Sequence, residues 1–225
     1  VKPTRQELAA RDSVERAAMR RDSVANAPVA TLRRPMSRGP AGSFGRLAAD
    51  AYRTALRADF AVAGGSDLDP VLPAGPLTNA VLVSAVPTEA RLLTVRLTGA
   101  VITTLVENLL ADSAPCCQIS GLTVEFDPRA RAYDRVKRLR TIRGLELDRK
   151  KSYTVALSTN LLAGDALPLA ATDCKAGKGC RTPAALDALG AVRSEVSVVD
   201  AVRDYLRRLP QPVVPPEDLR LVPRR

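Results

Sequence analysis

An amphipathic helix followed by a short apolar strand is the pattern that most constrains how this chain can fold. From Ser43 onwards, apolar side chains recur at the helical spacing of three to four residues, and Ser43 itself is a candidate N-cap. Residues 59–65 then form an apolar run that ends in Gly-Gly, which is typical of a strand leading into a tight turn. These two elements predict a domain in which a helix packs its apolar face against strands.

Further elements follow along the chain at helical or strand spacing. Strands are predicted at 92–98, 119–127, 135–142 and 153–159, and helices at 99–111 and 197–209. A capping box formed by Ser197 and Asp200 marks the start of the last helix. Helices mixed with mostly antiparallel hairpins predict an α+β fold.

The two ends of the chain differ in composition from the middle. Residues 1–25 have the pattern of a polar helix, which needs a partner surface to be stable, and residues 26–42 are rich in Pro, Gly and Ala. Residues 210–225 contain too much proline for a helix. We therefore divide the chain into an N-terminal helix and connector (1–42), a globular domain (43–209) and an extended C-terminal tail.

The chain is basic, with 34 Lys and Arg against 24 Asp and Glu, which favours acidic partners. Residues 129–151 hold ten basic and three acidic side chains. Nucleic-acid binders of the stacking type interleave aromatic rings with basic residues, and Tyr133 is the one ring in this segment. A solvated basic hairpin is therefore favoured over a nucleic-acid site.

The cysteines and the absence of histidine bear on metals and redox state. Cys116, Cys117, Cys174 and Cys180 do not have the spacing of a zinc site, so we expect neither a metal nor a cofactor. A disulfide between Cys174 and Cys180 could close the loop between them in an oxidising compartment, and two reduced thiols are the alternative. We interpret Cys116 and Cys117 as small buried apolar residues.

Seven sequence landmarks occur in an order that resembles the C-terminal, substrate-binding domain of the 5′-nucleotidase family. In order they are GRLAADAYR, ADFAVAGG, LPAGPLT, VRLTGAVITTLVENLL, QISGLTVEFDP, SYTVALSTNLLAGD and VVDAVRDYLRRL. The resemblance spans residues 32–221 and implies a layered α/β/β/α domain of the α+β class. Because most landmarks are core or turn residues, they indicate fold more than function.

The resemblance also bears on catalysis. In the family, a separate N-terminal domain carries a two-metal site with His, Asp and Asn ligands, which activates water for hydrolysis. A sequence without histidine cannot build that site in the family's pattern. We therefore predict that these residues are not an enzyme by themselves.

The family's phosphate-binding positions map onto three residues of this chain. Its paired arginines correspond to Arg34 and Arg38, although exposed charges in a Pro- and Arg-rich connector are an equally good interpretation. A further arginine of the family corresponds to Asp69 here. A carboxylate in place of a phosphate-binding cation turns attraction into repulsion.

The nucleoside-binding positions have changed more. Two aromatic rings clamp the base in the family, and here Thr88 and Leu167 stand at or beside those positions. Asp165 is the pocket residue that persists, and turn chemistry explains it equally well. Asp50, Asp59 and Asp127 also occupy family positions but can serve as polar residues at helix or strand edges. The resemblance therefore implies a degenerate nucleoside pocket.

A scaffold kept without its pocket predicts a non-catalytic structural or adaptor subunit. We expect it to be an extrinsic subunit that stabilises a larger membrane-associated complex. Its basic and proline-rich ends would bind other protein subunits or an anionic membrane surface. The alternative is a nucleotide- or phosphate-binding domain of a 5′-nucleotidase, separated from its catalytic domain and acting through Arg34 and Arg38.

Location is inferred from the family and from the start of the chain. Because the family is usually exported, we expect a periplasmic or extracellular protein, possibly peripheral to a membrane. The longest apolar run, residues 79–87, is too short to cross a bilayer. The chain begins without Met or a charged-then-apolar leader, as expected of a processed chain or an excised fragment.

Overall fold

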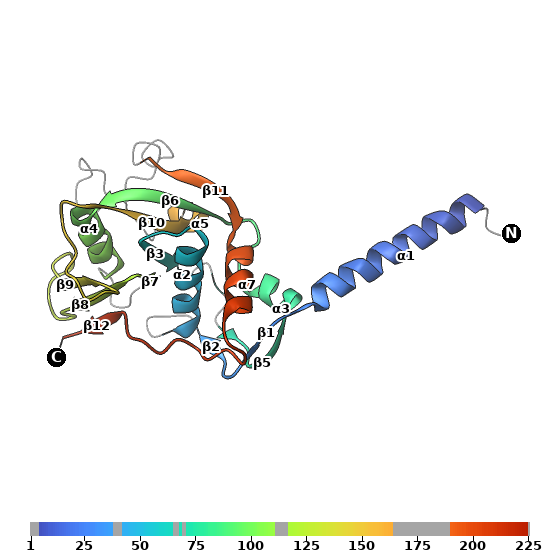
Figure 1. The fold of residues 1–225 in the computed structure, drawn as a ribbon, viewed down its shortest axis with the longest axis horizontal. Coiled ribbons are helices and arrows are strands. Elements are labelled where there is room, and N and C mark those ends of the chain that lie inside the picture. Colours follow the sequence, from blue (N-terminus) through green and yellow to red (C-terminus); the bar gives the residue numbers. More distant parts are fainter. Residues whose placement is uncertain are drawn as a thin grey trace.

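A long helix projects from a body of sheets and helices (Figure 1). The computed structural model describes residues 5–37, 42–64, 68, 71–110, 117–163 and 190–224. The projecting helix, α1 (Arg5–Asn26), confirms the helix predicted at the N-terminus. No helix in this part of the chain combines the length and the apolar character needed to cross a bilayer.

A five-stranded mixed sheet forms the centre of the body. Its strand order is β11 (Val192–Ser197), β6 (Arg91–Thr98), β10 (Ser152–Ser158), β3 (Phe60–Gly64) and β7 (Cys117–Ser120). β3 and β10 run parallel, and every other neighbouring pair is antiparallel. Helices thus combine with a mostly antiparallel sheet, which confirms the predicted α+β class.

The two faces of this sheet carry two separate hydrophobic cores. Strand residues alternate between them: Ala61 and Ala63 of β3 join one core, and Phe60 and Val62 join the other. Helices α2 (Ser43–Ala55) and α7 (Val198–Arg208) cover the first face. Helix α4 (Gly99–Leu109) and a second sheet cover the other.

The second sheet has three strands, and its origin corrects one prediction. The strand expected at 119–127 is two strands, β7 and β8 (Leu122–Phe126), which belong to different sheets. They separate at Gly121, whose φ of +90° strongly favours glycine. β8 pairs with β9 (Val136–Thr141) and with β12 (Leu221–Pro223). Local apolar alternation continues through the break, so it does not reveal the change of sheet.

Strand pairs and core contacts join the connector and the C-terminal segment to the body. β1 (Pro28–Leu32) pairs with β5 (Gly75–Thr78), and β2 (Met36–Ser37) pairs with β4 (Val71–Leu72). Leu32 and Met36 are buried in the first core. The C-terminal segment is extended, as predicted, but Val213 is buried beside Leu32 and the segment ends in β12. Apolar residues in a proline-rich segment thus supply core contacts.

Two short helices complete the described structure, and side-chain caps start three of the helices. The short helices are α3 (Asn79–Ala85) and α5 (Thr159–Ala163). Thr78, Thr98 and Ser197 cap α3, α4 and α7, which confirms the capping role predicted for Ser197. Ser43 is not an N-cap, because it is the first residue of α2 and Gly42 occupies the cap position without a side-chain bond.

Candidate functional site

Most residues predicted for a binding site lie outside the described part of the chain. Those outside it are Arg38, Asp69, Asp165, Leu167 and the cysteines Cys116, Cys174 and Cys180. Arg34 and Thr88 lie within it. Cys117 is buried in β7 within the second core, which confirms its interpretation as a buried apolar residue.

Arg34, the phosphate-binding candidate, already has an anionic partner. It follows β1, and its guanidinium forms an ion pair with Glu217 of the C-terminal segment. Both side chains are exposed, so the pair contributes little to stability. A phosphate that approached Arg34 would compete with the Glu217 carboxylate for the same cation.

Thr88 is exposed on the loop between α3 and β6, and the aromatic rings of the chain lie at other positions. The chain has three Phe, four Tyr and no Trp, and all seven rings lie in the described residues. Phe44, Phe60, Tyr52 and Tyr153 are buried in the two cores. Of all seven, Tyr133 alone is exposed, at 51%. Phe126 and Tyr205 are partly buried against the cores, so the seven rings include no two exposed ones to form a base clamp.

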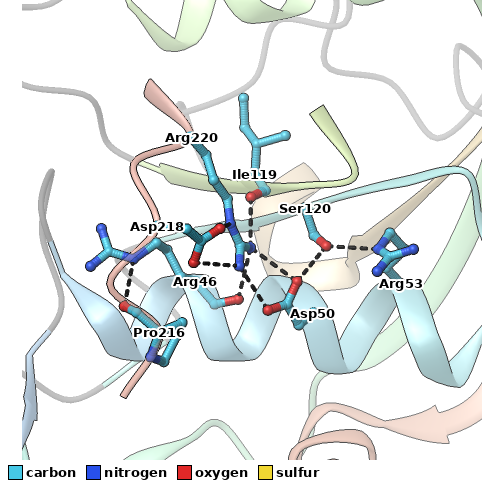
Figure 2. Close-up of polar contacts among 8 residues, drawn as sticks. All are labelled: Arg46, Asp50, Arg53, Ile119, Ser120, Pro216, Asp218 and Arg220. Atoms are coloured by element: carbon cyan, nitrogen blue, oxygen red, sulfur yellow. Dashed lines mark hydrogen bonds and ion pairs between the residues drawn. The ribbon is translucent and has the colours of Figure 1, made fainter. Parts of the chain in front are cut away.

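The most elaborate polar cluster joins the C-terminal segment to helix α2 (Figure 2). Arg220 donates to both carboxylate oxygens of Asp50, with N–O distances of 3.0 and 2.8 Å, and its Nε lies 2.8 Å from Asp218. It also donates to the main-chain oxygens of Arg46 and Ile119. Burial by itself lowers the pKa of Arg220, but its hydrogen bonds to Asp218 and Asp50 outweigh burial and raise that pKa.

Two more arginines of α2 border this cluster. Arg46 donates to the main-chain oxygen of Pro216 at 3.0 Å, and burial lowers the pKa of its guanidinium. Arg53 donates to Ser120 Oγ, which in turn donates to Asp50 at 2.6 Å (Figure 2). Because Arg220 bonds two carboxylates and two carbonyls, the arrangement holds two segments together. No local sequence pattern marks Arg220, so its role is visible only in the structure.

Three aspartates in family positions have structural roles, in agreement with their interpretation as polar residues at helix or strand edges. Asp50 binds Arg220 and Ser120. Asp59 accepts hydrogen bonds from the main-chain N–H and the hydroxyl of Thr154, at 2.8 and 2.9 Å. Asp127 accepts from the main-chain N–H of Arg129 in the turn after β8. Each aspartate is therefore explained by the fold.

A largely apolar groove runs between α1 and α3. Its volume is about 590 Å³, and its lining includes Arg20, Arg21, Val24, Ala25, Ala80 and Val83. Asn79 and Ser84 complete this lining, which thus combines aliphatic side chains with two arginines. No cluster of His, Cys, Asp and Glu suited to a metal occurs among the residues whose positions the structure gives.

Comparison with known proteins defines the family. The 5′-nucleotidase, C-terminal domain family model matches residues 23–171, more than half of the chain. The chain therefore belongs to the family of 5′-nucleotidase C-terminal domains, which confirms the resemblance found in the sequence. No curated protein matches the chain in sequence.

Solved structures agree on the fold. The 5′-nucleotidase precursor of Thermus thermophilus has a TM-score of 0.70 at 21% identity, covering 96% of this chain and 43% of its own. The NAD nucleotidase of Haemophilus influenzae has a TM-score of 0.75 at 13% identity, covering 96% and 42%. A sulfate thiohydrolase of T. thermophilus has a TM-score of 0.66 at 15% identity, covering 93% and 37%. The chain spans less than half the length of these proteins.

Proposed function

We propose that this chain is a non-catalytic structural or adaptor module that binds other protein subunits. The observation that carries the proposal is the placement of the aromatic rings. Four of the seven are buried in the cores, Phe126 and Tyr205 are partly buried against them, and Tyr133 alone is exposed, so no pair of exposed rings is left to hold a base. Loss of each stacking ring weakens binding by about 1–3 kcal/mol. Thr88 at the first clamp and Glu217 on Arg34 both act against nucleotide binding.

Helix α1 supports a role in protein binding. Its side chains at Val14, Met19 and Val24 are exposed, and the helix extends away from the body (Figure 1). A polar helix of this length is marginal in water without a packing partner. The groove between α1 and α3 offers such a partner a largely apolar surface that also includes Arg20 and Arg21. We infer that α1 is completed by another protein subunit with acidic character.

We infer further that this chain is part of a larger membrane-associated complex outside the cytoplasm. The inference rests on the exported character of the family and on the chain's positive charge, which suits acidic protein faces and anionic headgroups. Fractionation of the native cells followed by immunoblotting tests this location. Recovery from the cytoplasmic fraction would contradict it.

The adaptor role is tested with the full chain and a variant lacking residues 1–26. Calorimetry with adenosine and with AMP should show no saturable heat for the full chain. A pull-down from native cells in mild detergent should recover a stoichiometric partner with the full chain and not with the truncated one. Equal recovery by both chains, or micromolar binding of AMP, would contradict the proposal.

One observation favours a second candidate, a phosphate-binding domain of a longer 5′-nucleotidase. The match to a 5′-nucleotidase precursor includes 96% of this chain but only 43% of that protein. A longer protein with further domains is compatible with this match. This candidate predicts AMP binding that Arg34→Gln weakens about tenfold or more, because a charge-assisted hydrogen bond is lost. Glu217→Gln, which frees Arg34 from its ion pair, should instead strengthen AMP binding.

A further inference from the structure

The turn after β9 presents two aliphatic side chains to solvent. Ile142 and Leu145 are 67% and 65% exposed, among the most exposed large apolar residues in the described structure. Arg143 lies between them in sequence and is also exposed. Exposed aliphatic groups at the tip of a turn are unfavourable in water, and they become favourable when a hydrocarbon phase covers them.

The turn is held in one shape by main-chain hydrogen bonds. Gly144 N donates to Thr141 O at 2.8 Å, and Thr141 N donates to Leu145 O at the same distance. Gly144 has a φ of +76°, which glycine adopts without strain. Ile142 N donates to Gly121 O, tying the turn to the start of β8. Main-chain hydrogen bonds therefore hold the backbone that carries the two aliphatic side chains.

Arginines surround a single carboxylate on the neighbouring sheet. Glu125 of β8 lies within 4.0 Å of three guanidinium groups, those of Arg138, Arg140 and Arg224. Arg138 also pairs with Glu146, at 3.1 Å. Three arginines thus share two carboxylates, which leaves this face of the sheet cationic. Arg224 comes from the C-terminal segment, so the fold assembles the cluster from separate parts of the chain.

A small basic hollow continues the same face. Its volume is about 240 Å³ and its lining consists of Asp127, Arg129, Lys137 and Arg224. Arg129 and Lys137, together with Arg224, which also pairs with Glu125, outnumber Asp127 and make the hollow attractive to anions the size of a phosphate group. Residues 135–151 as a whole contain eight basic and two acidic side chains, Glu146 and Asp148.

We propose that the β9 turn and the outer face of the β12–β8–β9 sheet form a docking surface for an anionic lipid bilayer. The arginines attract the headgroups, and Ile142 and Leu145 enter the boundary between headgroups and acyl chains. The aliphatic tip favours a membrane, because the boundary between headgroups and acyl chains offers hydrocarbon to both side chains while the headgroups meet the arginines. This three-stranded sheet lies at the end of the body away from α1 (Figure 1). The inference does not depend on the adaptor function of α1.

Vesicle sedimentation with the full chain tests the proposal. The chain should sediment with vesicles of phosphatidylcholine and phosphatidylglycerol, and not with vesicles of phosphatidylcholine alone. The double variant Ile142→Asn/Leu145→Asn should partition at least about tenfold less, because it loses the apolar contribution. Arg143→Glu should also bind less, and salt at about 1 M should release the wild-type chain.

A matched control keeps the test specific. Val71→Asn/Val192→Asn removes two exposed aliphatic groups, 54% and 65% exposed, from β4 and β11, which belong to other sheets, and should leave vesicle binding unchanged. Far-UV circular dichroism should show all variants folded, since every substituted side chain is exposed. Equal losses in both double variants, or no sedimentation of the wild-type chain, would overturn the proposal. Binding to a labelled DNA duplex without binding to vesicles would also overturn it and identify the face as a nucleic-acid site.

Discussion

Arg220 and Asp50 lie 170 residues apart in sequence and form a two-pronged ion pair in the structure (Figure 2). Their side chains are only 9% and 16% exposed. The pair joins the C-terminal segment to the helix that covers the first core. In a buried pair, removing one partner costs more than the pair itself contributes, because it leaves an uncompensated charge.

We expect Asp50→Asn to destabilise the protein by about 3 kcal/mol, because the Arg220 charge then lacks its buried counter-ion. Urea denaturation followed by circular dichroism measures this change in the free energy of unfolding. The control is Arg34→Ala, which breaks the exposed pair with Glu217 and should cost less than about 1 kcal/mol. Similar losses in the two variants would show that Arg220 does not depend on Asp50.

The two ends of the chain should respond differently to truncation. Removal of residues 210–225 takes away buried Val213 and Arg220 and strand β12, so the remaining chain should melt at a lower temperature or fail to fold. Removal of residues 1–26 takes away exposed side chains of α1 and should leave the melting temperature of the body unchanged. Thermal denaturation of the two truncated chains beside the full chain checks both outcomes. A normal melt after the C-terminal deletion would contradict this account.

Gly121 should tolerate substitution less well than Gly144. A Cβ added at Gly121 would lie 2.4 Å from the main-chain oxygen of Asp59, in addition to the strain of a φ of +90°. Gly144 also has a positive φ, but a Cβ there would meet nothing within 4 Å. Gly144→Ala should therefore cost about 1 kcal/mol from the backbone alone, and Gly121→Ala clearly more. Chemical denaturation measures the free energy of unfolding of both variants. Equal costs would show that the strands move enough to relieve the contact with Asp59.

The start of α7 should give a pH-dependent contribution to stability. Hydrogen bonding from Ser197, opposed by partial burial and reinforced by Arg203, lowers the pKa of Asp200. A carboxyl with a lowered folded pKa stabilises the protein above its unfolded pKa, near 4, and loses that contribution as the pH falls through the folded value.

The difference in unfolding free energy between the wild type and Asp200→Asn should therefore be largest at neutral pH and shrink in acid. Denaturant titrations at a series of pH values measure it. Asp204→Asn, which removes an exposed carboxylate from the same helix, serves as the control. A difference that stays constant down to acidic pH would contradict the role of Asp200.

Residue patterns alone identified much of the fold. Spacing within a few residues predicted α2, α4 and α7 and the strands around 92–98, 135–142 and 153–159, because these elements each bury a regular face. The ordered landmarks identified the family, which the family model then matched. The sequence also predicted the loss of the first clamp ring at Thr88, since a missing aromatic residue is visible without coordinates.

Tertiary structure decided what depends on distant contacts. The break at Gly121 sends one apolar run into two sheets, at a glycine with a φ of +90° that lies close to the main chain of Asp59. Val213 and Arg220 are buried within the segment predicted as an extended tail, and a proline-rich segment has no local sign of such burial. The cationic face around Glu125 likewise needs arginines from two strands and the C-terminal segment. A sequence reports local periodicity, whereas packing also brings together side chains that lie far apart in the chain, such as Arg224 and Glu125, 99 residues apart.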